Sequence, residues 1–232
     1  MFDERYARQV MLPEIGEEGQ HRLASASVLL VGLGGLGSTV APSLAGAGVG
    51  RLGLCDPDVV SCSNLPRQTL YTEEEVGRPK CEMARRRLAA LSSATHFDCI
   101  AEGLTPENAE RLAASYDLVV DCCDNFATRY LIDDACAAAG RPWVYGSIGP
   151  FDGQVSLFNH RRGVRYATLY PDREALCSAP RRTLGVLGGV PAVIGAIEAT
   201  EALKLLAGME PSLDGRLLLF DLKTMHCETI DI

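Results

Sequence analysis

The sequence lacks a continuous run of about 18 apolar residues, the length that a transmembrane helix requires. Its first residues, Met1 to Glu18, are charged and contain no apolar core segment, so we expect no signal peptide and a cytoplasmic location. Basic residues are also in deficit, because 22 Lys and Arg stand against 30 Asp and Glu for a net charge of −8. This balance argues against nucleic acid or an anionic membrane as a partner.

No C-x-x-C pair occurs among the nine cysteines, so a structural zinc site built from such pairs has no support. The odd number of cysteines and the expected cytoplasmic location also argue against a disulfide framework. The four histidines are scattered, and no two have the spacing of metal ligands.

Apolar runs alternate with helical segments through the first two thirds of the chain. Strands are predicted at 27–31, 51–55, 97–101, 117–122 and 143–146, and helices at 39–47, 79–91, 105–115 and 129–139. Thr105 is expected to cap the third of these helices, and Gly140 to end the fourth. The alternation predicts an α/β fold with a Rossmann-like, doubly wound, mostly parallel sheet.

The last third has a different pattern. Residues 153–159 alternate as an antiparallel strand does, residues 163–180 are polar and irregular and predict a mobile loop, and 185–207 predict a helix of small residues. Two further strands are expected at 217–220 and 227–230. We therefore expect one domain over 1–232, with a helical arm (1–24), a nucleotide-binding part (25–150) and a second part (151–232).

The segment Gly32-Leu33-Gly34-Gly35-Leu36-Gly37 satisfies G-x-G-x-x-G between a predicted strand and a predicted helix. Glycines permit a tight turn and close approach of the backbone, and a helix N-terminus offers free N–H groups to phosphate. Asp56 ends the next strand, where an acid can accept hydrogen bonds from ribose. The alternative is a glycine turn that only packs the helix against the strand.

Two cations after Asp56, Arg67 and Lys80, favour ATP over NAD as the nucleotide. An enzyme that splits ATP between the α- and β-phosphates needs fixed positive charge there, whereas a dehydrogenase does not. Asp124 offers a carboxylate to Mg²⁺. The alternatives are solvated surface charges for Arg67 and Lys80, and a helix N-cap for Asp124.

Together these segments resemble the ThiF/MoeB/HesA family, relatives of the ubiquitin-activating enzymes. The resemblance is collinear over nearly the whole chain. It is carried by RYARQVMLPEIG, VGLGGLGS, DPDVVSCSNLPRQ, VGRPK, DLVVDCCDN and GVLGGVPAVIGAIEATEALKLLAG.

The resemblance implies a role for each matching position. Gly34 lies under the triphosphate, within a nucleotide-binding loop that includes Gly32, Gly35 and Gly37. Asp56 binds ribose, Asp124 binds Mg²⁺, and Arg8 reaches across a homodimer into the other subunit's site. The remaining nucleotide contacts come from Ser63, Asn64, Arg67, Lys80 and Asn125.

The activity implied is ATP-dependent adenylylation of a ubiquitin-like sulfur-carrier protein that ends in Gly-Gly, which would bind to the second part of the chain. A ThiS-like carrier of thiamine biosynthesis is favoured because of Cys177, and a MoaD-type carrier of molybdopterin synthesis is the alternative. Many family members bind zinc through two C-x-x-C pairs. Here Arg165 and Thr168 stand at the first pair, so no zinc is expected.

Cys177 falls near the position where some members of the family bond covalently to the carrier. Arg181 and Arg182 would favour its thiolate form, while the alternative is an unreactive loop cysteine. Two other functions stay open. The first is an NAD-dependent oxidoreductase, which would need an acid/base group for hydride transfer that the sequence does not offer. The second is a catalytically silent scaffold that binds carrier proteins, which would not need Arg67, Lys80 and Asp124.

Overall fold

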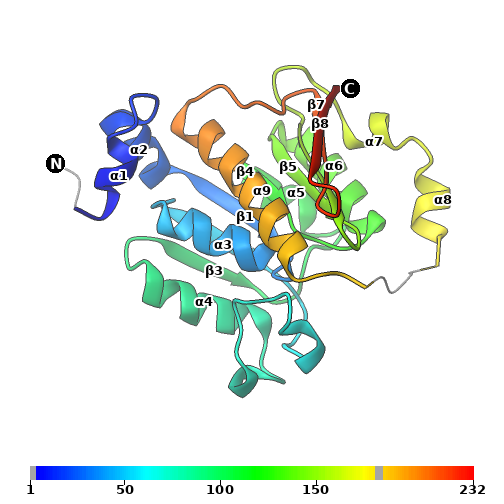
Figure 1. The fold of residues 1–232 in the computed structure, drawn as a ribbon, viewed down its shortest axis with the longest axis horizontal. Helices are drawn as coiled ribbons and strands as arrows, with labels where there is room; N and C mark the ends of the chain where they lie inside the picture. Colours follow the sequence, from blue (N-terminus) through cyan, green and yellow to red (C-terminus); the bar gives the residue numbers. More distant parts are fainter. Residues whose placement is uncertain (1–3, 181–184) are drawn as a thin grey trace.

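The computed structural model describes residues 4–180 and 185–232. Within these residues the chain forms one eight-stranded sheet in the order β3-β2-β1-β4-β5-β6-β7-β8. Figure 1 shows the N-terminal arm at one end of the sheet and the segment that carries α7 and α8 near the other. The strands are β1 (Ser27–Val31), β2 (Arg51–Cys55), β3 (His96–Ile100), β4 (Leu118–Asp121), β5 (Trp143–Ile148), β6 (Asp152–Phe158), β7 (Arg216–Asp221) and β8 (His226–Asp231).

The first five strands are parallel, and the last three pairings are antiparallel. Strands β1, β2 and β4 are apolar along most of their length because both of their faces are buried, as is usual for parallel strands. The order reverses at β1, whose neighbours are β2 on one side and β4 on the other. In such sheets ligands bind at the carboxyl ends of the strands beside this reversal. The predicted fold class is confirmed, including the antiparallel C-terminal strands.

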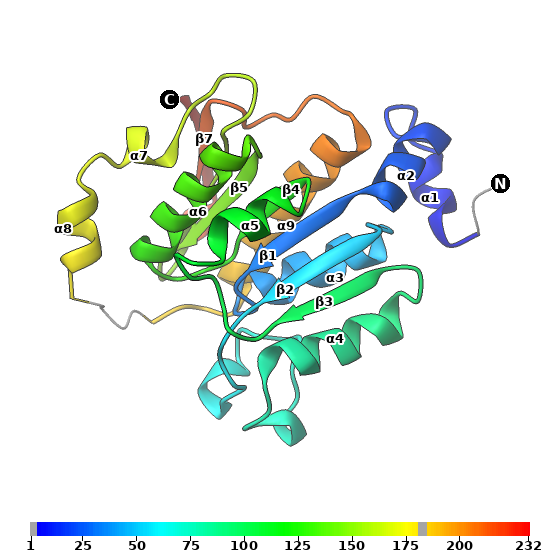
Figure 2. The same ribbon diagram turned by 180° about the vertical axis from the view of Figure 1, so that it is seen from behind.

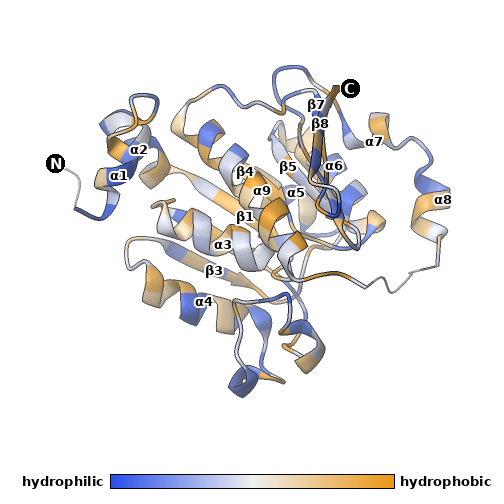
Figure 3. Cartoon of the chain, in the orientation of Figure 1, coloured by the Kyte–Doolittle hydropathy of each residue, from blue (hydrophilic) through white to orange (hydrophobic). Residues whose placement is uncertain are grey.

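Helices cover both faces of the sheet. Figure 1 shows α3 (Gly37–Gly46), α4 (Lys80–Leu91) and α9 (Gly189–Ala207) on one face. Figure 2, from behind, shows α5 (Ala109–Ala114) and α6 (Phe126–Ala139) on the other. Each face has its own hydrophobic cluster. In Figure 3 the hydrophobic colour follows the strands, while α4 carries both hydrophobic and hydrophilic residues.

The arm consists of a short turn of 3₁₀ helix (Glu4–Tyr6), α1 (Ala7–Val10) and α2 (Gly16–Ser25). Two buried or half-buried amides fix it to the rest of the chain, because Gln9 and Gln20 both donate to the carbonyl of Ala47, at 3.0 and 2.9 Å. Ala47 directly follows α3, so the arm lies at the C-terminal end of that helix. The predicted helical arm is therefore present from residue 4 onward.

The segment 163–180, predicted as an irregular loop, contains two short helices, α7 (Tyr166–Leu169) and α8 (Arg173–Ser178). The buried carboxylate of Asp133 on α6 organises the first, because it accepts hydrogen bonds from the N–H groups of Tyr166 and Ala167 and pairs with Arg165. The carboxylate of Asp172 caps the second by accepting from the N–H of Ala175.

Several predicted helix boundaries also differ, and α6 begins at Phe126, three residues before its predicted start. Helix α5 begins at Ala109 and not at Thr105, because the residues between them form a turn, and Asn108 is the N-cap. Helix α9 begins at Gly189, four residues later than predicted, whereas Gly140 ends α6 in the left-handed conformation as expected. No helix in the part of the chain described here is long and apolar enough to cross a membrane.

Candidate nucleotide site

The glycine loop connects β1 to α3 at the reversal of strand order. Gly32 has φ +101°, and a Cβ there would lie 2.5 Å from the carbonyl oxygen of Cys122. A Cβ on Gly37 would lie 2.4 Å from the oxygen of Gly32. These two glycines therefore allow the loop to close tightly against the end of β4.

Gly34 and Gly35 have a different role, because both are partly accessible. A Cβ on Gly34 would approach only the side-chain amide of Gln68, at 3.5 Å. Within the described structure the backbone N–H groups of these two glycines have no backbone acceptor. They precede the N-terminus of α3, so they form the cradle of free donors that a phosphate group fits.

Asp56 follows β2 and is bound to the glycine loop. Its Oδ2 accepts from the N–H of Leu33 at 2.7 Å and its Oδ1 from the N–H of Asp58 at 2.8 Å. The side chain is only about 6% exposed, and burial raises its pKa, although the positive charge of Lys80 opposes the shift. The glycine loop and Lys80 therefore hold the carboxylate of Asp56 in place, and Lys80 favours its ionised form.

Lys80 is the first residue of α4 and is almost fully buried. Its ammonium group lies 2.8 Å from a carboxylate oxygen of Asp58 and 3.8 Å from one of Asp56. The structure therefore rejects the alternative of a solvated surface charge at this position. Asp58, which sequence reasoning left without a role, supplies the nearer of the two carboxylates.

Ser63, Asn64 and Arg67 lie on one turn after β2, within or just beyond a 3₁₀ helix (Cys62–Asn64). Oδ1 of Asn64 accepts from the N–H of Ser61 at 3.2 Å, which leaves the amide NH₂ of Asn64 available. Arg67 is half-buried and its Nη1 donates to the carbonyl of Ser63 at 2.9 Å. The turn thus presents two donor groups, one of them cationic.

Asp124 is exposed in the segment that joins β4 to α6. It makes no hydrogen bond or ion pair with the described residues. The alternative of a helix N-cap is wrong for Asp124, because Asn125 caps α6 by accepting from the N–H of Thr128 at 2.9 Å. The backbone of Cys122 and Cys123, directly before Asp124, lies against Gly32, so the segment that carries Asp124 begins beside the glycine loop.

These groups fit a nucleotide triphosphate. Free loop amides, Lys80, Arg67 and Asn64 are donors for phosphate oxygens, and Asp56 is an acceptor for ribose hydroxyls. Within the described residues, no group of three or more His, Cys, Asp and Glu side chains could hold a metal. A Mg²⁺ ion at Asp124 would take its other ligands from phosphates and water, as this ion commonly does.

Sequence reasoning missed a buried ionic group beneath the site. Asp121 ends β4 and is fully buried, and its Oδ2 lies 3.2 Å from Nε of Arg129 on α6. Burial raises the pKa of Asp121, and Arg129 opposes this shift. Burial by itself would lower the pKa of Arg129, but Asp121, Cys123 and two neighbouring tyrosines together outweigh burial, so the pKa of Arg129 is raised. Asp121 is the acid that ends the apolar run DLVVD (residues 117–121), which is the signal that could have indicated such a pair.

Glu198 on α9 was also missed. Its carboxyl group is fully buried, neither oxygen has a hydrogen-bond partner among the described residues, and it fills the space beside Gly146 where a Cβ would be. Burial raises its pKa well above the ordinary value, Asp121 adds to the shift, and Arg129 opposes it. Burial therefore favours the neutral, protonated form of Glu198 in the folded chain.

Two predicted site residues lie apart from this group. Arg8 is exposed on α1, next to the C-terminal end of α3, whereas the glycine loop lies at the N-terminal end of that ten-residue helix, about 15 Å away. Cys177 is exposed on α8. Arg181 and Arg182, expected to act on this thiol, lie outside the described residues.

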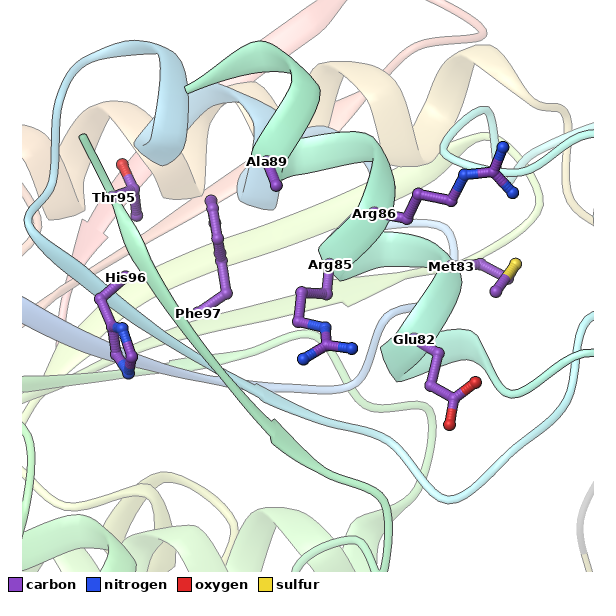
Figure 4. A pocket seen from close by; sticks show the side chains of 8 residues that line it. All are labelled: Glu82, Met83, Arg85, Arg86, Ala89, Thr95, His96 and Phe97. Carbon is purple, nitrogen blue, oxygen red and sulfur yellow. The ribbon is translucent and has the colours of Figure 1, made fainter. Parts of the chain in front are cut away.

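A groove of about 590 Å³ lies between α4 and the edge strand β3. Figure 4 shows its lining, with Arg85 and Arg86 on α4 and His96 and Phe97 on β3. It contains none of the predicted site residues, so the candidate site is the surface around the glycine loop and not this groove.

The fold and the loop define a Rossmann-like α/β protein with a modified dinucleotide-type glycine loop. A family model described as ThiF family matches residues 6–232. The chain therefore belongs to the ThiF family, as the sequence motifs predicted.

Known relatives agree with this assignment. The chain is 47% identical over 224 residues to "Sulfur carrier protein adenylyltransferase" of Thermus thermophilus, covering 94% of this chain and 83% of that protein. It is 48% identical over 223 residues to "Adenylyltransferase and sulfurtransferase MOCS3" of Sus scrofa and 49% identical over 220 residues to the protein of that name in Bos taurus. These alignments cover 94% of this chain, which spans about half the length of the MOCS3 relatives (48%).

Solved structures share the fold at lower identity. E. coli MccB, in a crystal structure with ATP, has a TM-score of 0.85 and 23% identity, and the match covers 99% of this chain and 72% of MccB. PaaA has a TM-score of 0.85 and 21% identity, over 100% of this chain and 76% of PaaA. At this identity the likeness concerns the fold alone.

Proposed function

We propose that this chain is an ATP-dependent adenylyltransferase that activates the C-terminal carboxylate of a ubiquitin-like sulfur-carrier protein. The observation that carries the proposal is the meeting of Lys80, Asp56 and the open glycine loop at one end of the sheet. The printed names of the Thermus and MOCS3 relatives support it.

In the proposed reaction a carboxylate oxygen of the carrier's terminal glycine attacks the α-phosphorus of ATP. A new P–O bond forms, the bond from the α-phosphorus to the oxygen that bridges to the β-phosphate breaks, and pyrophosphate leaves with the electron pair. The products are an acyl-adenylate and pyrophosphate. No enzyme nucleophile is needed, so the chain has to orient the reactants and neutralise charge.

Each residue then has a physical task. Lys80 and Arg67 offset the negative charge that builds on the phosphates, and the amides of Gly34 and Gly35 donate to phosphate oxygens. Asp56 holds the ribose while its own bond to Leu33 keeps it in place. Asp124 would hold Mg²⁺, which when bound supplies further positive charge to the phosphates.

The carrier is assigned here by class, as a small protein with a C-terminal Gly-Gly. The preference for a ThiS-like carrier and thiamine biosynthesis rests on Cys177 alone. The MOCS3 relatives, named as adenylyltransferase and sulfurtransferase, make a MoaD-type carrier an equal candidate. Activity with each purified carrier decides between them.

We also propose a homodimer with composite sites. Arg8 is on the arm at the C-terminal end of α3, opposite the end that adjoins its own glycine loop, so we expect it to act in the site of a second copy. Met11 and Leu12, which follow on the same arm, are 71% and 50% exposed. Two exposed apolar side chains on the arm that carries the exposed Arg8 fit a contact with a second subunit better than a contact with water.

Ligand-induced stabilisation tests the choice of nucleotide. ATP with Mg²⁺ should raise the melting temperature of the protein, and NAD should not. Exchange of labelled pyrophosphate into ATP should then depend on a carrier with an intact C-terminal glycine. Stabilisation by NAD and not by ATP would replace the proposal with the oxidoreductase alternative.

A further inference from the structure

Gln68 lies on the turn that carries Asn64 and Arg67, and it is 4% exposed. Its N–H donates to the carbonyl of Asn64 at 3.0 Å, and its carbonyl accepts from the N–H of Tyr71 at 3.2 Å. The hydroxyl of Tyr71 donates to the carbonyl of Leu33 in the glycine loop at 2.9 Å. The backbone of Gln68 is therefore fixed relative to that loop.

The side-chain amide of Gln68 has no hydrogen-bond partner in the described part of the chain. Its Oε1 is buried without a donor, and its Nε2 points to Gly34, 3.5 Å from the position of a Cβ there. Gln20, the other buried glutamine, is satisfied, because its amide donates to Ala47 at 2.9 Å and accepts from Gln9 at 2.7 Å. Buried amides are normally bonded as Gln20 is. In Gln68 the buried atom without a partner is the acceptor Oε1, while Nε2, near Gly34, is a donor available to a group that binds from outside the chain.

We propose that Gln68 is a nucleotide ligand whose Nε2 donates a hydrogen bond to a phosphate oxygen of ATP bound over Gly34. The inference rests on the proposed function and adds a residue to the same site. A phosphate presents only acceptor oxygens, and the amide offers donors at the position where the N–H groups of Gly34 and Gly35 are also free.

Replacement of Gln68 by methionine tests this role, because methionine keeps the length of the side chain and removes both polar ends. The affinity for ATP–Mg²⁺, measured by calorimetry, should fall about 10- to 100-fold, the loss expected for one hydrogen bond to a charged group. The affinity for adenosine, which has no phosphate, should not change. Gln68→Glu should lower the ATP affinity further, because its carboxylate repels phosphate.

Gln20→Met is the matched control. It should lower the melting temperature, since it breaks satisfied hydrogen bonds, and leave the ratio of ATP to adenosine affinity at the wild-type value. If the wild-type protein binds ATP and neither Gln68 variant changes that ratio, this inference alone is overturned. If the wild-type protein does not bind ATP, the proposed function is overturned with it. Should Gln68→Met not fold, Gln68→Glu decides: a loss of ATP affinity with adenosine binding retained supports the role, and unchanged ATP affinity refutes it.

Discussion

Two buried glutamates on α9, Glu198 and Glu201, should respond in opposite ways to the same substitution. Glu198 is 0% exposed and neither of its oxygens has a partner. Glu201 is 5% exposed, and its carboxylate accepts from the N–H groups of Ser212 at 2.8 Å and Leu213 at 3.0 Å and pairs with Lys204. We expect Glu198→Gln to stabilise the protein at neutral pH and Glu201→Gln to destabilise it.

The sign for Glu198 follows from its raised pKa. Below the unfolded pKa of about 4.3 the carboxyl is protonated in both states and does not make stability depend on pH. Above that value only the unfolded state ionises, so the wild-type protein loses about 1.4 kcal/mol of stability per pH unit until the folded pKa is reached. A carboxyl that stays protonated when folded therefore costs up to about 4 kcal/mol at pH 7, and glutamine, which does not titrate, removes this cost.

Glutamine also brings an amide NH₂ into an unpartnered site, which costs about 1–3 kcal/mol at every pH. The two curves should therefore cross, with Glu198→Gln less stable near pH 4 and more stable near pH 8. Glu201→Gln should lose about 1.5–3 kcal/mol near neutral pH, because it weakens charge-assisted hydrogen bonds.

Urea unfolding of the three proteins at pH 4 to 8, followed by circular dichroism, measures both effects. The critical observable is the difference in free energy of unfolding between Glu198→Gln and wild type as a function of pH. A difference that does not change with pH would show that Glu198 is ionised in the folded state and that the reasoning from its burial is wrong.

Four further outcomes are expected. We expect Lys80→Ala and Asp124→Ala each to lower pyrophosphate exchange by about 100-fold or more, because each removes charge stabilisation from the phosphates. The circular dichroism spectrum should be retained in both variants. Normal exchange in the Asp124→Ala variant would show that Asp124 is not a metal ligand. Mixing inactive Arg8→Ala with inactive Lys80→Ala protein should restore part of the activity if sites are composite, and a monomer active alone in sedimentation would exclude this. Cys177→Ser should leave exchange near wild type and abolish any reducible adduct with the carrier; an adduct that persists would make the cysteine a bystander. Asp133→Asn should lower the free energy of unfolding in urea by about 1–3 kcal/mol, because Asp133 binds Arg165 and caps α7. An unchanged urea midpoint would contradict this role of Asp133.

The central sheet could be predicted from local sequence because its strands are short apolar runs that end in turn residues. Strands β1 and β2 begin and end at the predicted residues, and Gly140 ends α6 as expected. Both kinds of signal are local, since a buried parallel strand is apolar on both faces and a left-handed cap favours glycine.

The segment 163–180 could not be predicted because its helices depend on distant residues. Helix α7 has four residues, too few to be stable alone, and its first N–H groups are satisfied by Asp133, more than thirty residues earlier. Helix α8 is capped locally by Asp172, but it packs on α6, where Arg173 pairs with Asp134 at 2.6 Å. Such contacts leave no periodic pattern in the sequence.

The residues of the candidate site likewise include some that local sequence indicates and others that only the folded structure reveals. The glycine loop and Asp56 could be selected from sequence because each directly follows a strand, whereas Lys80, the first residue of α4, is indicated by the VGRPK motif. Glu198 could not, because a glutamate in a helix is ordinarily solvated, and only the absent side chain of Gly146 on β5 makes room for it. The free amide of Gln68 could not be predicted either, since the lack of a partner is a property of the folded chain.

Mass spectrometry of the carrier tests the central claim most directly. The chain would be incubated with ATP, Mg²⁺, pyrophosphatase and the purified small protein that ends in Gly-Gly, and the intact carrier would be weighed. The account predicts a carrier that gains one AMP at its C-terminus, with no gain when the terminal glycine is removed or when Lys80→Ala protein replaces wild type. AMP on the truncated carrier, or no AMP on any Gly-Gly carrier although ATP binds, would contradict the account.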